Sequence, residues 1–168
     1  MDVALIVLGA IFVTYGWFWG GVTEARTTAY ALAAASVMLA LWFGFSGGAG
    51  GDAVGGTTVA FSAIFGFLAA ANAWNESAQD RTFGMFALLF AIVSFFGFMY
   101  FIDNSAPGQY TYAAILIGVT LALHFISAGL VHHNRGFKGV VGWVTLFAGI
   151  VLVYFGFAEA LGSGIEPL

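Results

Sequence analysis

The stretch that decides the fold is YTYAAILIGVTLALHFISAGLV, residues 110–131. A helix needs about 20 apolar residues to cross a hydrocarbon core, and this stretch carries no Asp, Glu, Lys or Arg. Its one histidine, His124, shares a helical face with Thr120 and Ser127, because residues three and four positions apart lie above one another. A titratable side chain within a membrane segment indicates a functional site. We therefore predict a membrane helix in which Thr120, His124 and Ser127 line a substrate path.

The alternative for His124 is a neutral imidazole that hydrogen-bonds to a neighbouring helix. The two interpretations differ in what His124→Phe does to permeability. Permeability falls if the side chain lines the path, and it is unchanged if the side chain only connects helices.

Composition extends the membrane prediction to the whole chain. Of 168 residues, 61% are hydrophobic and only 7% are charged, which excludes a water-soluble domain of this size. The apolar runs do not alternate with polar residues, so they predict helices and not strands of a barrel. Four basic residues against eight acidic ones exclude nucleic acid as a partner. Cysteine is absent, which excludes disulfides and thiolate chemistry.

Six apolar runs predict an all-α membrane protein with six transmembrane helices in a single domain, residues 1–168. The predicted helices cover residues 3–21, 27–45, 57–74, 82–102, 110–131 and 139–161. The connection 46–56 is rich in glycine and predicts a flexible loop. It lacks the Gly-Lys-Ser/Thr ending of a phosphate-binding loop.

Charge predicts the orientation of these helices. Every basic residue falls in the first, third or fifth connection, and the other end of the predicted bundle has only acidic residues. The basic residues are Arg26, Arg81, Arg135 and Lys138, and the acidic ones opposite are Asp2, Asp52, Asp103 and Glu166. Because basic residues near helix ends stay in the cytoplasm, we expect both termini outside the cytoplasmic (inner) membrane.

A weak internal repeat predicts the architecture. VMLALWFGFSG (residues 37–47) is similar to VTLALHFISAG (residues 119–129), which pairs the second helix with the fifth. At nearly the same offset, residues 8–16 are similar to residues 89–97. Two halves of three helices each must face opposite ways across the membrane. The prediction is therefore a pair of inverted three-helix repeats, with any solute path near their interface.

Several spaced motifs run through nearly the whole chain. They are Gly9 and Gly16, the turn VTEARTTA (residues 22–29), Asn72 ahead of Asp80 and Arg81, LLFAI (residues 88–92), and Trp143 ahead of Gly149 and Ile150. This framework resembles the AmiS/UreI family of amide and urea channels. The resemblance implies a homo-oligomeric ring such as a hexamer in the lipid bilayer, with a pore for small neutral amides in each copy.

The chain departs from the family at the positions that the resemblance implies for the pore. Tyr15 stands in place of an Asn, Met85 in place of a Trp, and Ser127 and Ala148 in place of Glu residues. These positions, together with Asn72 and Trp143, are the pore candidates that the resemblance adds. The framework is kept while its polar pore groups are replaced.

Two further polar residues have open interpretations. Glu159 lies close to the outer end of the sixth helix, where it either rings an outer mouth or is a helix-end carboxylate that reaches water. Asn72 either satisfies a backbone carbonyl or lines an inner vestibule. His132 and His133 either hold a metal ion or are residues of the cytoplasmic interface beside Asn134, Arg135 and Lys138. The second interpretation is favoured, because adjacent side chains on a helix point about 100° apart.

The predicted function is a passive channel for a small uncharged solute such as urea, a short-chain amide or ammonia. The alternative is an accessory subunit that keeps the channel scaffold and transports nothing. The chain has no recognisable catalytic set and no cluster of metal ligands, so we predict neither an enzyme nor a cofactor.

Overall fold

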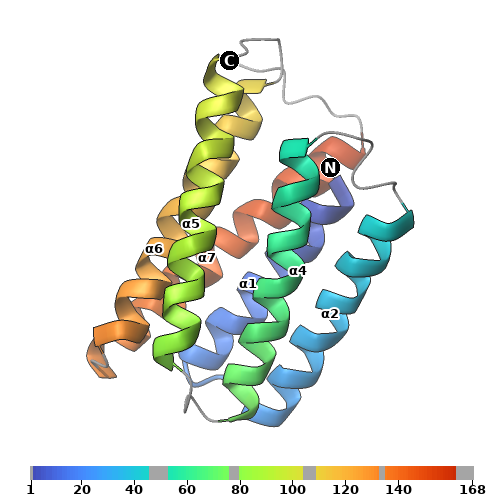
Figure 1. The fold of residues 1–168 in the computed structure, drawn as a ribbon. Coiled ribbons are helices and arrows are strands. Elements are labelled where there is room, and N and C mark those ends of the chain that lie inside the picture. Colours follow the sequence, from blue (N-terminus) through green and yellow to red (C-terminus); the bar gives the residue numbers. More distant parts are fainter. Residues whose placement is uncertain (1, 46–52, 76–79, 104–108, 133–134, 162–168) are drawn as a thin grey trace.

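The computed structural model describes residues 2–45, 53–75, 80–103, 109–132 and 135–161, and this part of the chain folds into six helices (Figure 1). They are α1 (Asp2–Trp19), α2 (Ala25–Phe45), α4 (Ala53–Trp74), α5 (Asp80–Asp103), α6 (Gln109–His132) and α7 (Arg135–Ala160). Five of them contain stretches long and apolar enough to cross a membrane, and α1 contains the shorter apolar stretch Val3–Trp19. The chain is thus an all-α, multi-pass membrane protein, as predicted.

The helices follow one another around a closed ring. Each packs against the next along the chain, and α7 packs back against α1. Three pairs pack most closely, namely α1 with α7, α5 with α6, and α2 with α4. The contacts between these pairs are looser, and α6 packs only loosely on α7. The predicted repeat would make α6–α7 the counterpart of α2–α4, but these two pairs differ in how closely they pack. The repeat itself stays a prediction.

Glycine makes the close approach of α1 and α7 possible. A Cβ atom added at Gly149 would lie 2.6 Å from the backbone nitrogen of Val13, and one added at Gly16 would lie 2.7 Å from that of Leu146. Gly9 lies against Gly149, and Gly16 against Gly142, so the two helices run antiparallel. The spaced glycines of the sequence therefore form the tightest helix contact of the bundle, as small residues do in membranes.

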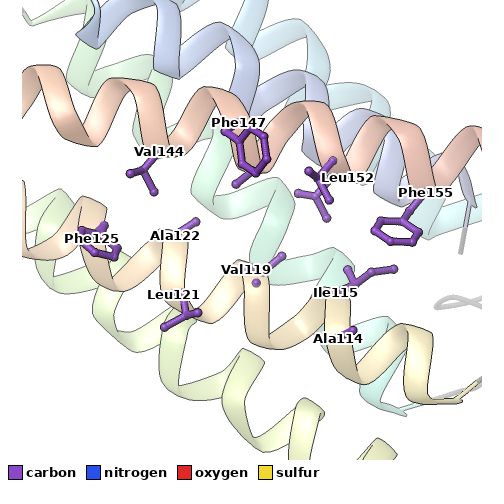
Figure 2. Close-up of a pocket in the computed structure, with 13 residues that line it drawn as sticks. Ala114, Ile115, Val119, Leu121, Ala122, Phe125, Val144, Phe147, Leu152 and Phe155 are labelled. Atoms are coloured by element: carbon purple, nitrogen blue, oxygen red, sulfur yellow. The ribbon is translucent and has the colours of Figure 1, made fainter. Parts of the chain in front are cut away.

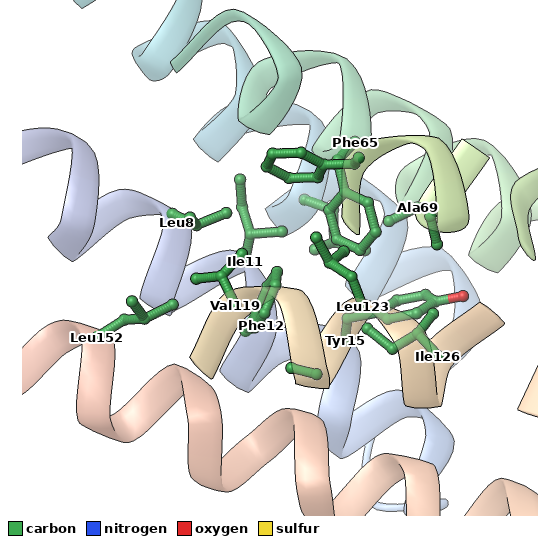
Figure 3. Close-up of a cluster of buried hydrophobic side chains, with 14 of the residues drawn as sticks. Leu8, Ile11, Phe12, Tyr15, Phe65, Ala69, Val119, Leu123, Ile126 and Leu152 are labelled. Atoms are coloured by element: carbon green, nitrogen blue, oxygen red, sulfur yellow. The ribbon is translucent and has the colours of Figure 1, made fainter. Parts of the chain in front are cut away.

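Aromatic and aliphatic side chains fill the middle of the ring (Figure 3). Phe12, Phe65 and Phe90 have no exposed surface. The centroids of the Phe12 and Phe65 rings lie 5.5 Å apart, and those of Phe65 and Phe83 lie 5.1 Å apart, which are contact distances for aromatic pairs. At this level the rings touch and leave no open slot between them.

Most helices extend further than the apolar runs predict. α5 begins at Asp80 rather than at residue 82, and α7 begins at Arg135 rather than at residue 139, because polar residues continue a helix beyond the hydrocarbon core and a carboxylate is favourable in a first turn. α4 begins at Ala53, so residues 53–56 are helical and the prediction of a loop there is wrong. The rest of that predicted loop, residues 46–52, lies outside the described residues.

α1 is the exception, because it ends two residues earlier than predicted. The amide of Val22 donates to the carbonyl of Trp17, and that of Gly21 donates to Phe18. Gly21 has a φ of 73°, the left-handed conformation that glycine adopts after the last turn of a helix. This cap turns the chain toward α2.

Candidate functional site

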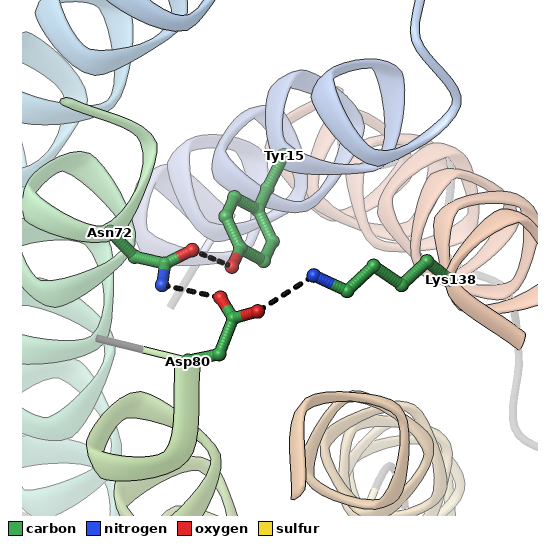
Figure 4. A network of polar contacts seen from close by, with 4 residues as sticks. All are labelled: Tyr15, Asn72, Asp80 and Lys138. Atoms are coloured by element: carbon green, nitrogen blue, oxygen red, sulfur yellow. Dashed lines mark hydrogen bonds and ion pairs between the residues drawn. The ribbon is translucent and has the colours of Figure 1, made fainter. Parts of the chain in front are cut away.

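Four side chains from four helices form a hydrogen-bonded chain at the end of the ring where α5 and α7 begin (Figure 4). The Tyr15 hydroxyl donates to Asn72 Oδ1 at 2.9 Å, and Asn72 Nδ2 donates to Asp80 Oδ1 at 2.9 Å. Lys138 Nζ lies 2.7 Å from Asp80 Oδ2. We call these four residues the Tyr15–Lys138 network, and we call this end of the bundle the Lys138 end.

The ends of four helices position this network. Tyr15 lies near the end of α1 and Asn72 near the end of α4, whereas Asp80 is the first residue of α5 and Lys138 lies in the first turn of α7. Asp80 is only 1% exposed, and a buried carboxylate needs a cation and hydrogen bonds. Lys138 supplies the cation, Asn72 supplies a hydrogen bond, and the amino end of α5 is favourable for negative charge. The site therefore carries no net charge.

The Lys138 ammonium also makes a second contact, with an aromatic ring. It lies 4.9 Å from the centroid of the Trp19 ring, within the range of a cation–π interaction. The Trp19 ring in turn lies 5.8 Å from that of Tyr15. Trp19 thus borders the network on the α1 side.

Ser94 Oγ is a buried polar atom with no hydrogen-bond partner in the part of the chain that the structure describes. Trp19 Nε1 has no partner of hydrogen-bonding geometry there, but the Trp19 side chain interacts with the Tyr15 hydroxyl. Other buried hydroxyls donate to the carbonyl four residues earlier, as Ser36 does to Leu32 and Thr145 does to Val141, each at 2.7 Å. Leaving a buried polar group unpaired costs about 1–3 kcal/mol. Such a group in a native protein needs an explanation, and a bound polar molecule is one.

Trp19 and Ser94 lie at different depths in the bundle. Ser94 follows Asp80 by 14 positions on α5, which is about 21 Å along a helix. Trp19 lies beside Lys138, at the end of the bundle. Between these levels lies the aromatic layer of the core, formed by Phe12, Phe65 and Phe83. The interior therefore offers hydrogen-bonding groups on both sides of an apolar layer.

The structure brings two of the predicted pore residues together, Tyr15 and Asn72, through their direct hydrogen bond. For Asn72 neither of the two interpretations from the sequence describes its partners. It bonds to side chains, Tyr15 and Asp80, and not to a backbone carbonyl. It lies at the predicted inner end of the bundle, within the network.

The predicted face of Thr120, His124 and Ser127 does not line the interior. The Thr120 hydroxyl donates to the Leu116 carbonyl of its own helix at 2.8 Å. His124 is exposed on the outer side of α6. Ser127 is buried at the contact with α5, where its carbonyl oxygen lies 3.3 Å from where a Cβ atom of Gly84 would be.

This face points away from the core of the single chain, because α6 turns another face inward, and its part in a solute path stays a prediction. Val119, Leu123 and Ile126 occupy the core face. A helix that is apolar on every side has no polar face from which its orientation about its own axis could be predicted. The packing of neighbouring helices determines which face lies inside.

The remaining predicted residues lie on the outside of the bundle or between helices. Met85 is 57% exposed and Trp143 is 70% exposed. Ala148 lines a groove between α6 and α7. Glu159 is exposed and accepts a hydrogen bond from the Tyr112 hydroxyl of α6.

Sequence reasoning missed Asp80, Lys138, Trp19 and Ser94 as members of the site. Asp80 and Lys138 appeared as loop charges because they lie just beyond the apolar runs. Ser94 had a usable signal, since it is a polar residue within an uninterrupted apolar run, as His124 is. Trp19 had none, because a tryptophan at a helix end is typical of the membrane interface.

Metal binding has no candidate among the described residues, which contain no group of three His, Asp or Glu side chains that could hold an ion. The side chains of His132 and His133 lie outside the described part of the structure.

No family model matches the chain, and no curated protein sequence matches it significantly. The resemblance to amide and urea channels therefore stays a prediction.

Proposed function

We propose that the protein is a passive channel for a small uncharged solute with hydrogen-bonding groups, such as urea, a short-chain amide or ammonia. One observation carries this proposal. Ser94 Oγ is buried inside the bundle of membrane helices and has no hydrogen-bond partner among the residues that the structure describes. A path for a neutral polar molecule explains why a bundle keeps such an atom unpaired in its interior.

The proposed path begins at the Lys138 end. A solute that enters there meets the Trp19 indole, which lies beside the Tyr15 ring. It then passes the aromatic layer at Phe12, Phe65 and Phe83 and reaches the Ser94 hydroxyl. Because the rings touch, a solute passes only when at least one ring rotates.

The same geometry favours uncharged solutes over ions. The aromatic layer offers no polar atom to replace the hydration shell of an ion, and such apolar constrictions exclude ions. The Asp80 carboxylate is paired with Lys138 at 2.7 Å, and Arg26 and Arg81 lie at the same end of the bundle, so this carboxylate does not concentrate cations at the entrance. An amide or ammonia loses much less hydration free energy than an ion when it enters this layer.

The topology that goes with this proposal has six crossings, inverted three-helix repeats and both termini outside the cytoplasmic membrane. The Lys138 end then faces the cytoplasm, together with Arg26 and Arg81. The resemblance to the AmiS/UreI family supports a ring of identical copies, each with its own path.

The test is stopped-flow shrinkage of liposomes that contain the purified protein, with gradients of urea, acetamide, ammonia and glycerol. We expect Ser94→Ala to lower the flux of the transported solute severalfold, since it removes the unpaired hydroxyl from the path. Ser62→Ala is the matched control, because the Ser62 hydroxyl is already bonded to the Thr58 carbonyl at 2.7 Å. Equal flux through the Ser94→Ala and wild-type proteins would overturn the proposed path.

His124→Phe provides a second comparison in the same assay. Because His124 lies on the outer side of α6, a path inside the bundle predicts unchanged flux. A fall in flux, with the oligomer intact, would place the path outside the single chain.

The second candidate function is an accessory subunit of a larger membrane complex. Two observations support it. Aromatic side chains fill the middle of the helix bundle, and the polar groups of the Tyr15–Lys138 network bond to one another. The two functions differ in what purification yields. A channel forms a stable ring of identical copies with solute flux, whereas an accessory subunit is stable only with foreign subunits and conducts none of the four solutes.

A further inference from the structure

A groove of about 340 Å³ lies between α6 and α7 (Figure 2). Every residue that lines it is apolar. Small residues of α6, among them Ala114, Gly118 and Ala122, form one wall, and Phe147 and Phe155 of α7 lie opposite. The groove exists because α6 and α7 pack loosely along this length.

Both ends of the groove are closed by contacts between the same two helices. Toward the Lys138 end, Gly129 packs against Val141 and Phe137. Toward the opposite end, the Tyr112 hydroxyl donates to Glu159. The groove is therefore a window of limited length between two membrane helices, and it lies within the apolar stretches Tyr112–Val131 and Phe137–Ala160.

The volume of the groove suits a thin apolar chain. A methylene group is about as large as a water molecule, roughly 30 Å³. The groove therefore has room for about ten methylene groups of one thin chain.

We propose that this groove binds one acyl chain of a membrane phospholipid that carries an ammonium headgroup, such as phosphatidylethanolamine. The chain lies along Gly118 and Ala122, and the headgroup lies at the Glu159 end. The Glu159 carboxylate is exposed there, and all four basic residues lie toward the other end of the bundle. This charge favours an ammonium and repels a purely anionic headgroup such as phosphatidylglycerol. The proposal depends on the membrane location of the protein and not on the proposed transport.

Gly118→Leu tests the chain site, because a Cβ atom at Gly118 meets nothing within 4 Å and the leucine side chain then occupies the groove. Its matched control is Gly44→Leu on α2, where a Cβ atom also meets nothing within 4 Å. The measurement is native mass spectrometry of the detergent-purified protein titrated with phosphatidylethanolamine or phosphatidylglycerol. The leucine side chain takes the place of part of the acyl chain and removes its contacts with the groove, so we expect roughly tenfold weaker binding.

We expect one tightly bound phosphatidylethanolamine per chain in the wild type and in Gly44→Leu, with roughly tenfold weaker binding in Gly118→Leu. Glu159→Gln should retain a bound lipid but bind the two headgroups equally. Unchanged binding in Gly118→Leu overturns the chain site, and equal binding of both lipids by the wild type overturns the headgroup site. This experiment measures lipid binding and not solute flux, so a failure of the lipid proposal is distinguishable from a failure of the proposed channel.

Discussion

The buried carboxylate of Asp80 forms an ion pair with Lys138. Lys138→Met keeps the length of the side chain but leaves the Asp80 carboxylate, 1% exposed, without its ammonium. Removing one partner of a buried ion pair costs about 3–5 kcal/mol. We expect a loss near 3 kcal/mol in the free energy of unfolding, because Lys138 keeps 24% of its side chain exposed. Unfolding of the purified protein by sodium dodecyl sulfate in mixed micelles measures it.

The control for this prediction is Arg81→Met, which removes a neighbouring charge from an exposed position. An exposed substitution of this kind changes stability by no more than about 0.5 kcal/mol. If both variants unfold like the wild type, the ion pair contributes nothing to the fold. The double variant Asp80→Asn with Lys138→Met should recover much of the loss, because no unpaired charge is left.

At the scale of elements, replacing glycine by alanine should change stability in opposite directions at two positions, one in the contact between α1 and α7 and one on the open surface of α2. Gly149→Ala places a methyl group 2.6 Å from the Val13 nitrogen, so the helices must separate, and overpacking costs about 1–3 kcal/mol. Gly44→Ala meets nothing within 4 Å and should stabilise its helix by up to about 1 kcal/mol. Thermal unfolding in detergent compares the two variants, and a stabilised Gly149→Ala would contradict the close packing.

At the scale of the whole molecule, the prediction concerns the side of the membrane on which each end lies. The chain contains no cysteine, so single cysteines report position without background. Glu24→Cys and Asp103→Cys are exposed sites at opposite ends of the bundle. With both termini outside, a membrane-impermeant maleimide labels Asp103→Cys in intact cells and labels Glu24→Cys only after lysis. The reverse pattern would invert the orientation.

The helices were predictable because each apolar run is long and nearly free of charge. The ends of the helices were less predictable. Polar residues such as those at 135–138 can extend a helix or form a loop, and the apolar pattern does not distinguish these two cases. The end of α1 was predicted two residues too late, at residue 21, although a glycine after an apolar run is a known stop signal. The close contact of Gly9 and Gly16 with α7 follows the spacing of glycine in the sequence.

The candidate site was predictable only in part. Tyr15 and Asn72 were named, but they were named separately and with other partners. His124 stood out as the most polar group in its helix and lies on the outside of α6. The sequence by itself determined that this is a membrane protein of apolar helices, because hydropathy is a local property.

Only the tertiary structure decided which face of each helix lies inside and that Asp80 meets Lys138, 58 positions along the chain. It also decided that α6 and α7 leave a groove between them. An apolar helix has the same affinity for lipid on all its faces, so its rotation and its neighbours follow from packing against other helices and not from its own sequence.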